Sequence, residues 1–322
     1  MSIAPVIVIG CGGSGGKVVL NLKRRIADEL KRRGWEHGLP GAWQFRWIDV
    51  PTAQEQHPEF GPPLAAKEYV ALAPSDHYGD VDDQLCQSAG QHLDRLAGWR
   101  PSPALSLPVS RGAGQMRAVG RAVALTRPLA ISDSIRSAVN AVQGGTAELG
   151  NLARFLAGGK NDSGVAVDNE TPIVFVVSSL AGGTGSGIYL DVCDIVRKGF
   201  PDLTNSVLAV LFTAEVFKGV KLDGGMAPNT VASFAELGAG ALSGGQATEP
   251  LLGPIGTQSV EGHGGPNATF VVGLSPLGNG PALQDASDCY RAVTETLVAT
   301  MMNAKFAGEF AAYQLTNFYN SN

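Results

Sequence analysis

The residues best suited to chemistry lie in one glycine-rich stretch, Ala181-Gly182-Gly183-Thr184-Gly185-Ser186-Gly187. Glycines let a backbone approach a ligand closely, and the Thr184 and Ser186 hydroxyls can add hydrogen-bond donors. An apolar run at 172–179 precedes the stretch, and apolar residues recur at helical spacing over 188–197. Because the first turn of a helix leaves N–H groups free at the positive end of the helix dipole, the pattern favours a phosphate site over a plain glycine turn.

A second glycine loop follows the strand expected at 6–10, with the sequence Gly10-Cys11-Gly12-Gly13-Ser14-Gly15-Gly16-Lys17. The helix expected after it runs to about residue 33, and Lys17 in its first turn could reach a phosphate or face solvent. Gly10, Gly12 and Gly15 satisfy the dinucleotide fingerprint, which is a weak signal by itself. The loop is not a Walker A motif, because no Ser or Thr follows Lys17.

A third glycine turn, Gly112-Ala113-Gly114-Gln115, lies between a strand expected at 104–109 and a helix expected at about 116–142. Arg117 and Arg121 lie one helical turn apart there and could face a phosphate or water. The strand expected at 45–49 ends in Asp49, whose carboxylate could contact a ribose, a magnesium shell or only a turn amide.

Composition excludes several classes of function. The 322 residues are 44% hydrophobic and 16% charged, with a net charge of −5, so no general attraction to nucleic acid is expected. The four cysteines are far apart and form no CxxC pair, which favours a reducing cytoplasm over a disulfide framework or a zinc site. His57, His77 and His92 lack ligand spacing, so no protein-held metal is expected. No apolar run approaches the roughly 20 residues of a membrane span, and no signal-peptide layout precedes the first strand.

Strands that alternate with helices predict a parallel, Rossmann-like α/β sheet flanked by helices. Further strands are expected at 206–213 and 268–274, and further helices from Asn229, as N-cap, to 237 and over about 285–313. The 51–103 segment reads as loop with short helices, and 144–170 as a surface connection within a single domain. Ligands of such sheets bind at the carboxyl ends of the strands, where all three glycine loops are expected. Three loops around one site would suit a nucleotide with several phosphates.

In these residues the chain resembles the tubulin/FtsZ superfamily, and within it the divergent bacterial tubulin-like proteins. The 181–187 stretch is similar at every position to the glycine-rich phosphate loop of that superfamily, and 10–16 is similar to the first phosphate loop of FtsZ. The 112–114 turn, with 119–121 after it, keeps the FtsZ spacing of the loop that faces the γ-phosphate. Residues 217–219 weakly resemble the ribose-side loop. Asn279 and Asp288 match the two positions that contact guanine.

The resemblance implies a tubulin/FtsZ-type GTPase domain over residues 1–322 that ends in the long central helix. The C-terminal activation domain of the family is not part of these residues, either because the chain was cut there or because the protein lacks that half. It implies GTP or GDP as the ligand, Mg²⁺ bound through phosphate and water, and self-assembly into filaments, and it leaves room for a separate protein partner. In this family the next subunit supplies the carboxylates that activate water. We therefore expect little turnover by this chain alone, and no catalytic residue is assigned. Two departures are notable: Lys17 stands where FtsZ has Asn, and Ala118 replaces a nucleotide-contacting glutamate.

Two other functions remain open from the sequence. A Rossmann-type NAD(P) oxidoreductase would use Gly10, Gly12 and Gly15 for the pyrophosphate and Asp49 for the ribose, although Asp49 lies farther from the glycines than that motif requires. The third reading is a nucleotide-binding switch or scaffold that neither hydrolyses nor polymerises. A nucleotide that co-purifies with the protein would separate the oxidoreductase from the other two, and nucleotide-dependent sedimentation would separate a filament from a switch.

Overall fold

The structure is a computed structural model that describes residues 2–158, 166–167, 171–219, 224–242, 264–275 and 282–314. Its centre is a parallel six-stranded sheet with the strand order β4-β3-β2-β6-β7-β8. The strands are β2 (Val6–Cys11), β3 (Trp43–Asp49), β4 (Tyr69–Ala71), β6 (Ile173–Ser179), β7 (Val207–Phe212) and β8 (Ala268–Val272). A short parallel pair, β1 (Ser2–Ile3) and β5 (Ala166–Val167), lies outside it. The predicted parallel α/β fold is confirmed.

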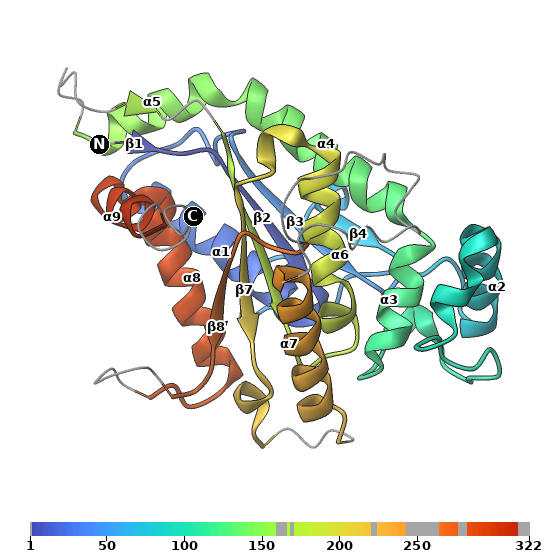
Figure 1. Ribbon diagram of the computed structural model, residues 1–322. Helices are drawn as coiled ribbons and strands as arrows, with labels where there is room; N and C mark the ends of the chain where they lie inside the picture. The colour runs from blue at the N-terminus through green and yellow to red at the C-terminus, as the bar shows by residue number, and fades with distance from the viewer. Residues whose placement is uncertain are drawn as a thin grey trace.

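Helices cover both faces of the sheet, and each face has its own apolar core (Figure 1). One layer consists of α1 (Gly12–Arg32), α5 (Thr146–Leu156), α8 (Ala286–Met302) and α9 (Ala304–Gln314). The other consists of α2 (Tyr78–Ala89), α3 (Arg117–Leu125), α4 (Pro128–Gly144), α6 (Thr184–Gly199) and α7 (Met226–Leu242). Every residue of β2 and β7 is buried, as expected for parallel strands that are covered on both faces.

The prediction of a strand at 104–109 is wrong. The segment has no regular ladder, and Pro108 forms one isolated bridge with His77 before the 3₁₀ helix Val109–Arg111. Proline cannot donate a backbone hydrogen bond, which removes a rung from any ladder through this position. The single helix predicted over 116–142 is also two helices. Pro128 lacks the N–H that would continue α3 and instead occupies the first position of α4.

The long helix predicted at 285–313 is broken at Asn303, which has extended backbone angles between α8 and α9. The Asn303 side chain accepts hydrogen bonds from the N–H groups of Lys305 and Phe306, so it caps the start of α9. Two other predictions need correction. The 144–170 connection contains the helix α5, and Asn229 lies inside α7 rather than at its N-cap.

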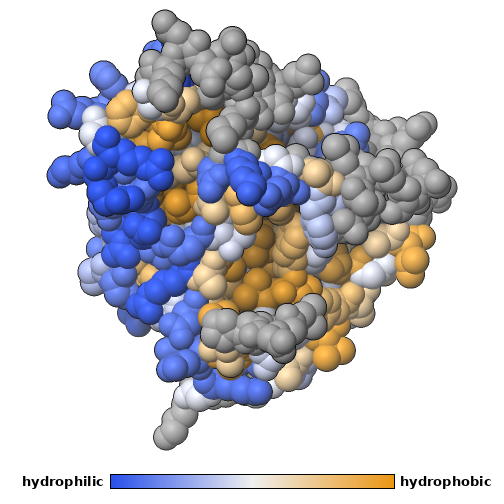
Figure 2. Space-filling model, turned by 90° about the vertical axis from the view of Figure 1, so that its left-hand side faces the viewer, coloured by the Kyte–Doolittle hydropathy of each residue, from blue (hydrophilic) through white to orange (hydrophobic). Residues whose placement is uncertain are grey.

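The face that carries α8 and α9 has a broad apolar area at its centre and polar side chains to the left (Figure 2). On β8, the last strand of the sheet, the Val271 side chain is 52% exposed. Among the described residues, no helix combines the length and the apolar character that a membrane crossing needs.

Candidate functional site

The three glycine loops meet in one cleft of about 530 Å³ at the carboxyl ends of β2, β3 and β6. Each loop contributes residues to its floor: Cys11, Gly12, Gly13 and Ser14 from the first; Gly112, Ala113 and Gly114 from the second; Gly182, Gly183, Thr184 and Gly185 from the third. The parallel sheet brings the first and third loops together, because β2 and β6 end at the same edge. The second loop follows the 3₁₀ helix at 109–111 rather than a strand.

The glycines of the cleft serve two different purposes. At the seams the backbones touch: the Gly183 N–H donates to the Gly114 carbonyl at 3.1 Å, and a Cβ on Gly183 would overlap that oxygen. Gly12 has φ +70°, and a Cβ there would lie 2.7 Å from the Gly185 nitrogen. In contrast, a Cβ on Gly13 or Gly182 would meet no atom within 4 Å. The seam glycines close the floor, and the open ones leave room above it.

Two helices begin at the floor of the cleft. α1 begins at Gly12 and α6 at Thr184, and neither helix has a side-chain N-cap or an acidic residue in its first turn. The N–H groups of both first turns therefore lack the partners that usually satisfy them, and both positive dipole ends point to the same space. This arrangement favours an anion.

Asp49 lies at the end of β3 and is 5% exposed. Its carboxylate accepts hydrogen bonds from the Val50 N–H at 2.8 Å, the Trp47 indole N–H at 3.2 Å and the Thr184 side chain. Burial nevertheless dominates and raises the pKa of Asp49 to about 6. Asp49 therefore ties β3 to the first residue of α6 beneath the cleft. Burial likewise raises the pKa of the Cys11 thiol beside it.

Side chains from α8 and from the 51–60 loop line the cleft opposite this floor. The Tyr290 hydroxyl lies 3.0 Å from that of Ser14, and burial raises its pKa to about 12. The Lys17 ammonium lies 5.9 Å from the centre of the Tyr290 ring. His57 is flanked by two carboxylates, with Glu55 at 3.2 Å and Glu59 at 3.6 Å from its ring nitrogens.

Several residues that the sequence suggested for the site do not line the cleft. Gly10 lies beneath the floor, where a Cβ would meet the backbone of Gly15 at 2.5 Å. Ala181 and Ser186 are buried behind the third loop. The Gln115 side chain accepts from the Gly225 N–H on the far side of the loop.

Arg121 and Asp288, two charged candidates for the site, have other partners in the fold, and Asn279 lies outside the described residues. The Arg121 guanidinium pairs with Asp191 at 3.1 Å and lies over the Trp99 ring. Asp288 accepts from the Gln284 N–H just before α8, while Ala286 and Ser287 of the same segment line the cleft. Asn279 is not among the described residues.

Sequence reasoning missed most of the side chains opposite the floor. The residues not predicted for the site include Pro51, Glu55, His57, Glu59, Phe60, Arg111, Ser179, Ala286, Ser287 and Tyr290. The 51–60 loop has no periodic pattern that could place it. Tyr290 carried a usable signal, because a tyrosine one turn into a helix that follows a strand of a parallel sheet stands near the strand ends.

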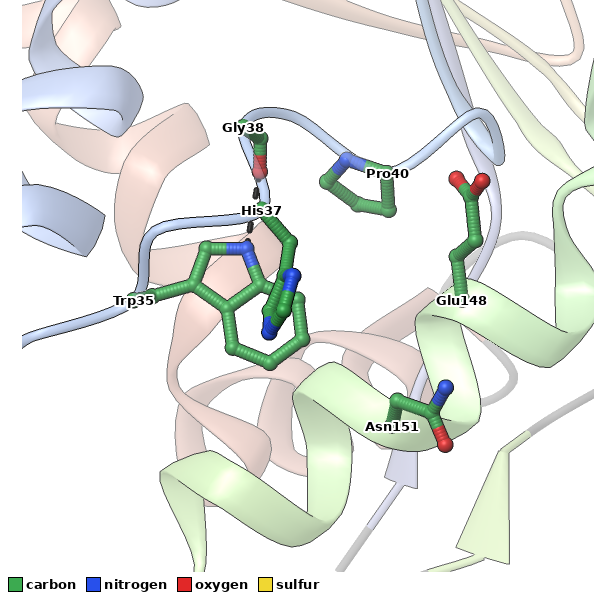
Figure 3. A pocket seen from close by; sticks show the side chains of 6 residues that line it. All are labelled: Trp35, His37, Gly38, Pro40, Glu148 and Asn151. Atoms are coloured by element: carbon green, nitrogen blue, oxygen red, sulfur yellow. Dashed lines mark hydrogen bonds between the residues drawn. The ribbon is translucent and has the colours of Figure 1, made fainter.

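A second hollow, of about 450 Å³, lies between the loop after α1 and α5 (Figure 3). The Trp35 indole N–H donates to the Gly38 carbonyl at 2.8 Å, and the Glu148 carboxylate accepts from the Gly41 N–H at 2.7 Å. The first bond lies within the loop, and the second fixes the loop onto α5. The hollow shares no residue with the cleft, and we assign it no ligand.

An open parallel sheet with glycine loops at its carboxyl edge defines a Rossmann-like α/β protein of the kind that binds nucleotides at that edge. The family model described as tubulin like matches residues 7–320, so the chain belongs to the tubulin-like family. This confirms the resemblance that the glycine loops suggested.

Solved structures of the same superfamily are similar over most of this chain. They include CetZ1 from Haloferax volcanii as a GDP-bound monomer (14% identity, 92% of this chain and 58% of that one, TM-score 0.41). TubZ of Clostridium botulinum phage c-st is 11% identical over 93% and 60%, with a TM-score of 0.45. CetZ from Methanosaeta thermophila is 12% identical over 98% and 60%, with a TM-score of 0.43. This chain thus spans about three fifths of the length of these structures. The search of the curated proteins returned no match.

Proposed function

We propose that the chain binds GTP or GDP, with Mg²⁺, in the cleft between its three glycine loops. One observation carries the proposal: the uncapped N-termini of α1 and α6 open onto the same floor, beside glycines whose Cβ positions are empty. Membership of the tubulin-like family supports a guanine nucleotide over other anions.

The phosphates would lie over the first turns of the two helices. Backbone N–H groups near Gly13 and Gly185 would hold them, and the Lys17 ammonium would add a positive charge. Among the described residues, no group of three or more His, Cys, Asp and Glu side chains could hold a metal ion alone. Mg²⁺ would therefore arrive with the phosphates, and water, the Thr184 hydroxyl or the Asp49 carboxylate would complete its oxygen shell.

The base would lie toward the N-terminus of α8, where Ala286, Ser287 and Tyr290 line the cleft. The family resemblance proposes Asn279 and Asp288 for guanine recognition, with acceptors that face the N1–H and 2-amino donors. Because the Asp288 carboxylate already accepts the Gln284 N–H, its role would require that bond to be shared or released.

We further propose that the protein self-assembles into filaments and that a neighbouring subunit completes GTP hydrolysis. We assign no catalytic carboxylate to this chain, because the family resemblance places the water-activating carboxylates on the next subunit. Isolated chain should accordingly bind GTP with little turnover. A non-polymerising switch would bind nucleotide equally well but would not sediment with it.

An NAD(P) oxidoreductase is the less favoured function. It would need Asp49 to accept both ribose hydroxyls, but Asp49 lies farther along the chain from Gly10, Gly12 and Gly15 than that motif requires. The 182–185 floor would also have no role beside a single pyrophosphate.

Calorimetric titration of the purified chain with GTP, GDP, ATP and NADH tests the proposal. We expect GTP and GDP to bind at least about tenfold more tightly than ATP, and NADH not to bind. Preference for NADH, or no binding of any nucleotide with Mg²⁺ present, would overturn it. Sedimentation of the chain with GTP and with GDP then tests assembly separately.

A further inference from the structure

A single buried amide joins two of the glycine loops from behind. Asn229, on α7, is 9% exposed, and its Nδ2 atom donates to three backbone carbonyls. The acceptors are Gln115 at 2.8 Å, Ala181 at 3.1 Å and Gly182 at 3.4 Å. The first belongs to the loop after the 3₁₀ helix at 109–111 and the other two to the loop before α6.

Other contacts brace the same junction. The Gly225 N–H, just before α7, donates to the Gln115 side chain at 3.2 Å. The Arg117 guanidinium pairs with Glu236 of α7 and donates to the Ser186 carbonyl at 3.2 Å. The Ser186 hydroxyl donates to the Gly182 carbonyl. α7 is thus fastened to both loops on the side away from the cleft, with Asn229 at the centre.

The direction of these carbonyls decides what the cleft offers to a ligand. A peptide group has its N–H opposite its C=O, so the Ala181 carbonyl, held behind the loop, leaves the Gly182 N–H directed forward. The N–H groups that follow the other two carbonyls bond to the loops themselves, because Gly183 donates to Gly114 and Met116 donates to Ala113. A carbonyl turned into the cleft would instead present a negative dipole end to a phosphate. Gly182, where an added Cβ would meet no atom within 4 Å, offers little steric resistance to such a rotation of the peptide before it.

We infer that Asn229 is a positioning residue for the nucleotide polyphosphate: by holding the Gln115, Ala181 and Gly182 carbonyls, it keeps the two loops in their anion-binding orientation. The inference rests on the proposed GTP site. It makes α7, which contributes no residue to the lining of the cleft, a determinant of phosphate affinity.

The test uses Asn229→Ala and a neighbouring control, Thr230→Val. The Thr230 hydroxyl is buried without a hydrogen-bond partner among the described residues, so its removal leaves the loops untouched. Calorimetry with Mg²⁺ compares GTP, GDP and GMP for both variants. Asn229→Ala should lose about tenfold in GTP affinity and progressively less for GDP and GMP, while Thr230→Val stays within about twofold of the native protein.

Asn229→Asp separates hydrogen bonding from packing, because aspartate keeps the shape but loses the amide donor. When ionised, the aspartate would face three carbonyl oxygens, so the GTP affinity of Asn229→Asp should fall relative to that of the native protein as pH rises. The GTP affinity of Asn229→Ala relative to the native protein should not change with pH. Thermal melts at each pH identify the folded samples.

The outcomes separate the two proposals. If native protein fails to bind GTP, the proposed function fails. If native protein binds but Asn229→Ala binds as tightly, or loses equally for GTP, GDP and GMP, the role of Asn229 is overturned while the proposed function stands.

Discussion

The phenol hydroxyl of Tyr290 lies 3.0 Å from the hydroxyl of Ser14, although 276 positions separate the two residues. The contact joins α8 to the first turn of α1 across the mouth of the cleft. The Tyr290 ring also packs edge-on against Phe60 and Phe212, at centroid distances of 5.6 and 5.2 Å. α8 is therefore fixed to the side of the cleft where α1 begins by one polar contact and a set of ring contacts.

A double-mutant cycle measures the coupling energy between the Tyr290 and Ser14 hydroxyls. Tyr290→Phe and Ser14→Ala each remove one partner and leave the ring contacts in place, so their combined effect on the free energy of unfolding should be less than additive by about 1 kcal/mol. Urea denaturation of the two single variants and the double variant gives the coupling. Strict additivity would show that the hydroxyls do not interact.

Gly182 and Gly183 should respond in opposite ways to alanine. A methyl group on Gly182 meets no atom within 4 Å, so Gly182→Ala should fold normally and weaken GTP binding by occupying the open floor. A methyl group on Gly183 would overlap the Gly114 carbonyl, so Gly183→Ala should lower the free energy of unfolding by about 1–3 kcal/mol. Thermal melts and calorimetry check both. Equal stability of the two variants would contradict the floor described above.

Asp49 should make stability depend on pH in a defined direction. Burial raises its pKa from 3.8 to about 6, so between about pH 4 and 6 the folded protein holds a proton that the unfolded chain has released. The free energy of unfolding therefore contains a contribution that is lost as pH rises through this window, on the order of 3 kcal/mol.

Asp49→Asn removes the titration and provides the comparison. As pH is raised from about 4 to 7, the variant should gain stability relative to the native protein, because only the native protein carries the cost of ionising a buried carboxyl. Chemical denaturation at four pH values measures the difference. Parallel pH profiles would show that Asp49 ionises as readily in the folded protein as in the unfolded chain.

Lys17 should contribute to phosphate binding through its charge. Its ammonium lies 5.9 Å from the centre of the Tyr290 ring at the edge of the cleft. Lys17→Ala should lower GTP affinity about tenfold at low salt, with a smaller loss at high salt because ions screen the interaction. Lys31→Ala, in the last turn of the same helix, is the control and should change nothing. The same loss from both variants would indicate a general charge effect.

Arg121 should matter for stability rather than for binding. Its guanidinium contacts Asp191, whose side chain is 8% exposed, so Arg121→Ala would leave that carboxylate buried without this partner. We expect a loss of about 2–4 kcal/mol in the free energy of unfolding and unchanged GTP affinity in the folded fraction. A selective loss of GTP affinity at unchanged stability would contradict this prediction and show that Arg121 contributes to nucleotide binding.

Sequence patterns predicted the parallel sheet and the meeting of its first and third glycine loops because both follow from local periodicity and from one geometric rule. The second loop lies at the predicted place but for a different reason, since no strand precedes it. The long apolar runs of β2, β6 and β7 have few other structures open to them. The same patterns could not separate seam glycines such as Gly183 from open ones such as Gly182. That difference depends on which backbone approaches from elsewhere in the chain.

Tertiary contacts determine two other features, the role of Asn229 and the course of the 51–60 loop. Asn229 follows a proline and reads locally as a helix cap, but in the fold its amide is used by carbonyls more than 40 positions away, inside α7. The 51–60 loop has no pattern of its own and takes its course from aromatic contacts, among them His57 with Trp47 and Phe60 with Tyr290. Neither arrangement leaves a local trace in the sequence.

The main-chain contact between β2 and α1 limits how this site could change. A methyl group on Gly10 or Gly15 would penetrate the neighbouring backbone, so substitution cannot reshape that half of the floor without moving a helix. The opposite wall is made of side chains, including His57 and Phe60, that can be exchanged one at a time. Diversification of ligand preference among related chains, and any redesign of it, should therefore concentrate in the 51–60 loop, while the glycine floor stays constant.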